Sequence, residues 1–324
     1  MATGTLGRCL LIQVQGLTKY YDERPAVVDL TFSVPRGQVL GFLGPNGAGK
    51  STTMRILTGY IGSTEGTATV AGYDVFEHSR EVRRHVGYLP ELNPLYLDMR
   101  VDGYLELMCR LRGVAPARRR VRIDAAIESC GLEERRREVI GRLSKGLRQR
   151  VGLAQATVHE PDVLILDEPT AGLDPRQTRE SRDLIKGLGS RHTVILSSHV
   201  LSEVQAACQR VVIIDEGRLV ADDSPAALSK QMSGRRGHQV EATVRGSESE
   251  IRAALAGLRS VQRLEVEPTE DGEWRVTVEG TGSDLQDVVA RAVVGRGLGL
   301  RELRARTFSL EDVFLRLTRE NRKN

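Results

Sequence analysis

A glycine-rich loop between an apolar strand and a helix constrains this chain more than any other feature. The apolar segment 38–43 is strand-like, and it is followed at positions 44–51 by Gly-Pro-Asn-Gly-Ala-Gly-Lys-Ser. A helix is expected from Lys50 to Leu57. This spacing, in this context, is the pattern of a phosphate-binding loop. Apolar strands then alternate with helices as far as Leu219, which predicts an α/β core with a largely parallel sheet, a P-loop NTPase fold.

The residue types in the loop match the chemistry of holding a triphosphate. Glycines let the backbone curl so that successive N–H groups point at phosphate oxygens, and the N-terminus of the following helix adds to that field. Lys50 supplies a positive charge to the terminal phosphates, and the Ser51 hydroxyl can ligate Mg²⁺. We therefore expect ATP and Mg²⁺ as ligands. The expected nucleotide-binding residues of this segment are Gly44, Pro45, Asn46, Gly47, Ala48, Gly49, Lys50, Ser51 and Thr52.

Two acids end a second apolar strand, Val163–Leu166. Carboxylates at the carboxyl end of a parallel strand face the ligand crevice of such a sheet. We expect Asp167 to hold Mg²⁺ and Glu168 to act as general base on the attacking water. A strand that merely meets a helix cap is the structural alternative.

The segment Leu143-Ser144-Lys145-Gly146-Leu147 precedes a helix, with Ser144 placed as its N-cap. It resembles the Leu-Ser-Gly-Gly-Gln signature of the ATP-binding cassette (ABC) family, although Lys145 and Leu147 depart from that signature. The resemblance implies that Ser144, Lys145 and Gly146 contact ATP bound by a second copy of the chain. It thus implies a head-to-tail dimer with nucleotide between the copies.

Other positions fit the same resemblance. It implies that Tyr21 stacks on adenine, with Tyr20 as the less favoured choice, and that Asp174 bridges to the partner copy. It also implies that His199, at the end of the strand 193–198, contacts the γ-phosphate. In place of the family's usual Gln the chain has Glu91, which can still ligate the cation but adds negative charge near the triphosphate.

The chain is long enough for one large and one small domain. We expect an ATP-binding domain at 10–232, with an inserted helical subdomain at about 92–140, and a linker at 232–237. The remainder, 238–324, reads as an α+β domain of β-α-β-β-α-β, ferredoxin-like order, followed by a helix from about Leu310 to Thr318. Its role stays open between a packing or dimer-supporting module and a ligand-sensing regulator.

Composition excludes several classes. No apolar run approaches the roughly 20 residues of a membrane span, and four scattered cysteines suggest neither zinc nor disulfides. The net charge is +4, partly from arginines at 118–120 and 135–137, which suit a solvated face or anionic lipid head groups.

The resemblance extends to type-2 ABC transporters, whose ATPases pair with separately encoded six-helix permeases. It implies an ATPase that energises an exporter, is cytoplasmic, and is peripheral on the inner face of the cell membrane. The alternative is an ABC ATPase that acts on nucleic acid or ribosomes without a permease. Such proteins typically carry tandem cassettes or long insertions, which this chain lacks, so no nucleic-acid partner is expected.

Overall fold

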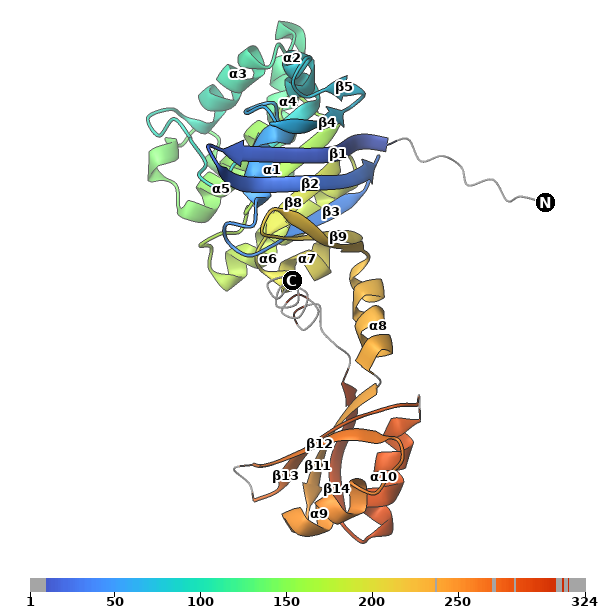
Figure 1. Ribbon diagram of the computed structural model, residues 1–324. Coiled ribbons are helices and arrows are strands. Elements are labelled where there is room, and N and C mark those ends of the chain that lie inside the picture. The colour runs from blue at the N-terminus through green and yellow to red at the C-terminus, as the bar shows by residue number, and fades with distance from the viewer. Residues whose placement is uncertain are drawn as a thin grey trace, which may run out of the picture. The chain divides into compact units, whose positions relative to one another are not determined.

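The computed structural model describes residues 10–236, 238–269, 272–282, 284–306, 311 and 314. The chain divides into two compact units, with the boundary between Ser224 and Pro225. Figure 1 shows the elements of each unit. Among the described residues, no helix has both the length and the apolar character that crossing a bilayer requires.

The core of the larger unit is a six-stranded sheet in the order β10-β9-β3-β8-β7-β6. All neighbours from β9 to β6 pair in parallel, and only the edge strand β10 is antiparallel. The three central strands are completely buried, as their near-continuous apolar sequences predict. The strands are β3 (Val39–Leu43), β6 (Val86–Leu89), β7 (Val163–Asp167), β8 (Thr193–Ser198), β9 (Arg210–Asp215) and β10 (Arg218–Asp223).

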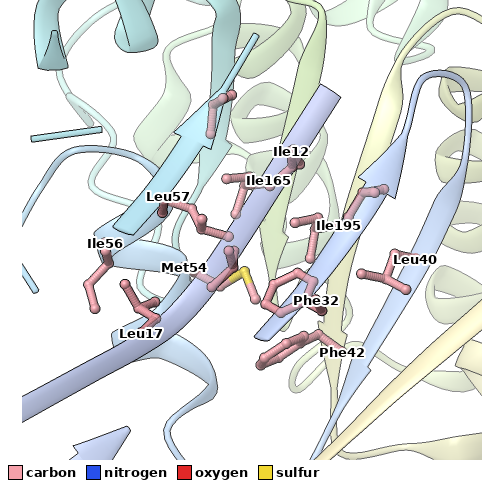
Figure 2. Close-up of a cluster of buried hydrophobic side chains, with 14 of the residues drawn as sticks. Ile12, Leu17, Phe32, Leu40, Phe42, Met54, Ile56, Leu57, Ile165 and Ile195 are labelled. Carbon is pink, nitrogen blue, oxygen red and sulfur yellow. The ribbon is translucent and has the colours of Figure 1, made fainter. Parts of the chain in front are cut away.

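A second, antiparallel sheet in the order β2-β1-β4-β5 lies over the first helix. Its strands are β1 (Leu10–Tyr21), β2 (Arg24–Pro35), β4 (Glu65–Val70) and β5 (Tyr73–Asp74). The helix α1 (Lys50–Leu57) sends apolar side chains into one cluster with both sheets (Figure 2). The labelled members of that cluster are Ile12, Leu17, Phe32, Leu40, Phe42, Met54, Ile56, Leu57, Ile165 and Ile195. This packing fixes the start of α1 at the carboxyl edge of the parallel sheet.

Helices fill most of the segment between β6 and β7. The helical elements of the larger unit are α2 (Ser79–His85), α3 (Val101–Leu111), α4 (Pro116–Ser129), η1 (Glu133–Arg135), η2 (Ile140–Arg142), α5 (Lys145–Thr157), α6 (Pro175–Gly189) and α7 (Leu201–Ala207). The expected helical insertion near 92–140 corresponds to α3, α4 and the two short 3₁₀ turns. Contacts of α5 with both α3 and β6 join this insertion to the sheet.

The smaller unit begins with α8 (Pro225–Arg236). Residues 232–236 of the expected linker at 232–237 therefore lie in a helix, and the linker prediction is wrong for them. Small and basic residues there suggest a break, but a helix accommodates single Gly and Ser residues at a modest cost. Next come β11 (His238–Arg245), α9 (Glu248–Leu255), β12 (Val261–Pro268), β13 (Trp274–Gly280), α10 (Leu285–Gly295) and β14 (Gly299–Arg306).

These six elements follow the expected β-α-β-β-α-β order. Their strands form an antiparallel sheet in the order β12-β13-β11-β14. Alternate residues of β11 and β13 pack with both helices into a separate apolar core. The final helix expected near 310–318 lies outside the described residues, apart from Glu311 and Phe314.

Candidate functional site

The loop between β3 and α1 is shaped by glycines at positions that other residues could not easily occupy. Gly47 and Gly49 have φ values of +81° and +99°, in the region that side chains disfavour. A Cβ at Gly44 would lie 2.6 Å from the carbonyl oxygen of Ile214, and one at Gly49 would collide with the carbonyl of Ala26. The backbone of β2 and β9 packs directly against the loop, and this packing stabilises its curved conformation.

Lys50 is the first residue of α1, and only 6% of its side chain is exposed. Its ammonium donates to the loop carbonyls of Gly44 at 2.7 Å and Pro45 at 3.3 Å. The N-cap of α1 is Gly49, which provides no side-chain acceptor for the first N–H groups of the helix. A cationic side chain and uncapped amides consequently meet at one place, which is the chemistry of an anion site.

Parallel pairing brings two further segments to this loop. Leu43 is paired with Ser198, and Asp167 is paired with Ser197, so β3, β8 and β7 end side by side. The residues that follow β7 and β8 are Glu168 and His199, which therefore lie beside the loop. Glu168 Oε1 is 3.4 Å from Lys50 Nζ, and Glu168 Oε2 is 2.8 Å from His199 Nδ1.

Glu168 has a left-handed backbone conformation, with φ at +47°. A non-glycine residue in this region costs about 1 kcal/mol, so neighbouring bonds must hold it. Its N–H donates to both the carbonyl oxygen and the Oγ of Ser197, at 3.2 and 3.0 Å. The Ser197 hydroxyl in turn donates to Asp167 Oδ1 at 2.5 Å. One serine of β8 thus positions both acids of β7.

The segments enclose a cavity of about 450 Å³. Its lining combines the loop and the start of α1 with both candidate catalytic side chains and the exposed Glu91. The lining residues are Ala26, Pro45, Asn46, Gly47, Gly49, Lys50, Ser51, Thr52, Glu91, Glu168, Ala171 and His199. Most residues expected to bind one nucleotide are therefore brought to a single place.

The donor set fits a triphosphate with a divalent cation. A Cβ at Gly47 would meet no atom within 4 Å, so the backbone there is open to a ligand. Asp167 is 2% exposed and forms no ion pair with any described residue. Because a buried unpaired charge is unfavourable, a cation bound at this carboxylate would stabilise it. The described residues contain no cluster of three or more metal-binding side chains. Mg²⁺ suits such a site because it normally takes one or two protein ligands together with phosphates and water.

Comparison with known proteins gives the family. A family model described as ABC transporter matches residues 27–171. Nod factor export ATP-binding protein I of Ralstonia nicotianae is 35% identical, over 97% of this chain and 95% of that protein. This chain belongs to the ABC transporter family. It is one of the ATP-binding subunits.

Two further comparisons agree with this ABC transporter assignment. Daunorubicin resistance ATP-binding protein DrrA2 of Streptomyces coeruleorubidus is 34% identical, over 97% of this chain and 96% of that protein. A solved structure described as an ATP-binding subunit of an ABC transporter is 30% identical with a TM-score of 0.63. That match covers 70% of this chain and 95% of the solved chain. The relatives thus span both units, whereas this solved chain has the length of the ATP-binding unit.

A second group of expected site residues in this ABC subunit lies at the N-termini of α5 and α6, not in the cavity lining. Ser144 Oγ caps α5 by accepting from Leu147 N at 3.3 Å, and Asp174 Oδ1 caps α6 by accepting from Gln177 N at 2.8 Å. The two helix ends are neighbours, because a Cβ at Gly146 would lie 2.7 Å from the Gln177 side chain.

Lys145 is exposed, and its ammonium lies where a side chain on Gly172 would be. The departure from the family signature at this position therefore places a cation against the segment that leads to Asp174. Ser144, Lys145 and Asp174 are exposed, whereas Gly146 is buried next to Lys145, and none of the four lines the cavity around Lys50.

Tyr21 is the last residue of β1 and is 45% exposed. The Lys19 ammonium lies 5.6 Å from the centre of its ring. The cavity lining includes the nearby Ala26 of β2 but neither Tyr21 nor Tyr20. Stacking of Tyr21 on adenine stays a prediction.

Sequence reasoning missed three residues that the structure places at the site. Ser197 bonds to both acids, Ala26 lines the cavity, and Glu203 of α7 is a buried carboxylate beside them. The Ser-Ser-His end of β8 was a usable signal for Ser197, since hydroxyls at a strand end can bond to the neighbouring strand. Nothing local in the sequence marks Ala26 or Glu203.

Proposed function

We propose that this subunit hydrolyses ATP in the cavity around Lys50 and uses the energy to drive export through a separately encoded membrane permease. The observation that carries the proposal is the position of Glu168, which contacts Lys50 on one side and His199 on the other at the edge of the phosphate loop. The proposed base Glu168, the proposed phosphate-binding cation Lys50 and His199 all line the same cavity.

In this proposal the loop amides and Lys50 bind the β- and γ-phosphates. Ser51 and Asp167 would hold Mg²⁺, which would neutralise phosphate charge. Glu91 is a further candidate ligand because it lines the same cavity as Ser51. The Glu168 carboxylate accepts a proton from the attacking water as the oxygen–phosphorus bond forms. The bond from the γ-phosphorus to the bridging oxygen breaks, and ADP leaves with that oxygen. His199 orients the carboxylate through its 2.8 Å contact and reaches toward the γ-phosphate.

A second copy would complete the site. Ser144, Lys145, Gly146 and Asp174 lie away from the cavity of their own chain, and two of them begin helices whose N-termini attract anions. A head-to-tail pair would place this surface over the nucleotide of the partner copy. ATP would then hold the pair closed, and hydrolysis would release it.

The permease would dock on an exposed apolar surface near the helical insertion. The large apolar side chains exposed at the start of that insertion are Leu92, Tyr96 and Leu97. Leu92 is 86% exposed and follows Glu91 directly, so a partner seated there would touch the segment that reaches the cavity. We call this set the apolar docking surface.

Export as the direction of transport rests on the relatives, which are named as Nod factor export, daunorubicin resistance and bacitracin transport ATP-binding proteins. The same names favour a transporter over an ATPase that acts on nucleic acid. A cytoplasmic position at the inner face of the membrane follows from the proposed permease. In this setting the second unit serves as an accessory module.

Replacement of Glu168 by Gln tests the catalytic proposal. We expect phosphate release to fall on the order of 10²- to 10³-fold, because a positioned base contributes about that much. With ATP and Mg²⁺ present, the variant should elute as a dimer on size exclusion. Glu65→Gln, on the exposed start of β4, is the matched control and should match the wild type. Full turnover in Glu168→Gln would refute the proposed role of the carboxylate.

The permease proposal has its own test. Leu92→Asp should prevent co-purification of a multi-span membrane protein from detergent extracts, while phosphate release by the isolated subunit stays near the wild-type level. Val294→Asp introduces the same charge at a 60% exposed site of the second unit and serves as control. Recovery of ribosomes or DNA in place of a membrane protein would favour the alternative function.

A further inference from the structure

Glu203 is a buried carboxylate that the proposed chemistry does not use. It lies on α7 and is only 8% exposed. It forms no ion pair with any residue in the described part of the chain. Burial of a charge is costly unless hydrogen bonds compensate it, so the donors around Glu203 indicate what it holds in place.

Both donors come from the segments that carry the catalytic side chains. Glu203 Oε2 accepts from Thr170 Oγ1 at 2.6 Å and from Ser198 Oγ at 3.2 Å. Thr170 follows Glu168 by two residues, and Ser198 immediately precedes His199. A single carboxylate oxygen thus connects the turn after β7 with the end of β8.

The helix that carries Glu203 is itself closely packed on the sheet. A Cβ at Gly41 of β3 would collide with the side chain of Val204 and lie 3.2 Å from Cys208 Sγ. The missing side chain at Gly41 therefore lets α7 approach the strand that leads into the phosphate loop. The packing of α7 on β3 thus fixes the position of Glu203, whose carboxylate bonds to the segments at the ends of β7 and β8.

The contact between Glu168 and His199 depends on how these ends are placed. Glu168 has a left-handed backbone, and its Oε2 lies 2.8 Å from His199 Nδ1. Glu168 and His199 each directly follow the last paired residue of their strand, and the Glu168 N–H still donates to Ser197 of β8. We propose that Glu203 is a positioning residue for ATP hydrolysis, which fixes the turn after Glu168 against the strand end before His199. This inference rests on the proposed roles of Glu168 and His199.

The test compares five variants with the wild type by steady-state phosphate release and by ATP-binding calorimetry. In Glu203→Ala we expect kcat to fall about 10- to 100-fold, since small misplacements of reacting groups cost that much. KM and the dissociation constant for ATP should stay within roughly 2-fold, because the phosphate loop is untouched. Glu203→Gln keeps an oxygen that can accept both hydroxyl bonds and should restore kcat to within roughly 3-fold of wild type.

Thr170→Val removes one of the two bonds and should give an intermediate kcat, which also covers the case in which Glu203→Ala does not fold. Gln205→Ala, on the exposed face of the same helix, is the matched control and should change neither kcat nor KM. A Glu203→Ala enzyme with wild-type kcat would overturn the inference. So would a Glu203→Gln enzyme as slow as Glu203→Ala, or equal losses in kcat and ATP affinity, because these outcomes indicate a different role.

Failure of the inference can be told apart from failure of the proposed function. Glu168→Gln is measured in the same series. If Glu168→Gln is inactive while Glu203→Ala is fully active, only the positioning role is lost. If Glu168→Gln turns over normally, the catalytic proposal itself is wrong.

Discussion

The ammonium of Lys50 lies 3.4 Å from a carboxylate oxygen of Glu168, and both side chains are at least nine-tenths buried. Lys50 is the cation expected to bind the terminal phosphates, and Glu168 is the expected base. A triphosphate in the loop would therefore compete with Glu168 for the same charge. This contact would couple nucleotide affinity to the proposed catalytic base.

Neutralising Glu168 should consequently strengthen ATP binding. In Glu168→Gln the amide attracts Lys50 less than the carboxylate does, and it does not repel the γ-phosphate. We expect the dissociation constant for ATP to fall about 10-fold, which corresponds to about 1.4 kcal/mol. Calorimetry with Mg²⁺ measures it, and an unchanged or weaker affinity would contradict the competition.

The opposite change is expected when Lys50 is removed. Lys50→Ala takes away a charge-assisted bond to phosphate, which is worth about 1.5–3 kcal/mol, so affinity should fall roughly 10- to 150-fold. Lys186→Ala, on the exposed side of α6, is the control for loss of a lysine. Equal affinities of Lys50→Ala and wild type would exclude Lys50 from the phosphate site.

Loss of the Ser197 hydroxyl should raise the Mg²⁺ concentration that ATP hydrolysis requires. Its hydroxyl donates to Asp167 Oδ1 and accepts from the N–H of Glu168. Ser197→Ala therefore removes the donor to Asp167, whereas the Glu168 N–H keeps its bond to the Ser197 carbonyl oxygen. Loss of a partner that orients a metal ligand typically costs about 10- to 100-fold in metal affinity. The Mg²⁺ concentration for half-maximal phosphate release should rise by about that factor. The exposed Ser190→Ala is the control, and an unchanged Mg²⁺ requirement would argue against Asp167 as a ligand.

Alanine substitutions at Gly49 and Gly113 should distinguish the cost of backbone strain from the cost of a steric collision. Both have positive φ, +99° and +73°, but a Cβ at Gly49 would collide with the carbonyl of Ala26, whereas one at Gly113 would meet nothing within 4 Å. Gly113→Ala should lower the free energy of unfolding by about 1 kcal/mol, and Gly49→Ala by at least about 2–3 kcal/mol. Urea unfolding of both variants measures the difference, and equal losses would mean that the loop yields freely.

Acid should weaken the fold through His159. Burial, with the nearby Arg112 charge, lowers the pKa of His159 to about 3 from its ordinary 6.5. Between these two values the unfolded chain binds a proton that the folded chain does not, so stability declines as pH falls below 6.5. One pH unit in this window removes up to about 1.4 kcal/mol.

The measurement is the free energy of unfolding at pH 7.5, 6.5 and 5.5. His159→Gln, which can still donate to the Val86 carbonyl, should show a shallower decline than the wild type. His78→Gln, at an exposed position, should follow the wild-type slope. Identical slopes for all three proteins would show that His159 takes up protons equally in the folded and unfolded chain.

Local residue patterns alone determined the phosphate loop, the two acids at the end of β7 and the cap of α5. Each depends on neighbours in the chain: glycines at fixed offsets, an apolar strand before two carboxylates, and an oxygen three residues before the N–H it accepts. The β-α-β-β-α-β order of the second unit was readable for the same reason. The linker at 232–237 was misjudged, because composition alone does not exclude a helix.

Only the tertiary structure decided which of these pieces meet. Strand pairing set Glu168 between Lys50 and His199, separated Ser144 and Asp174 from that cavity, and brought in Ser197 and Glu203. The physical reason is that side chains far apart in the sequence, such as Ser197 and Asp167 at 30 positions, become neighbours through the order and register of the sheet. Those depend on how both sheets pack around α1, and no single segment carries that information.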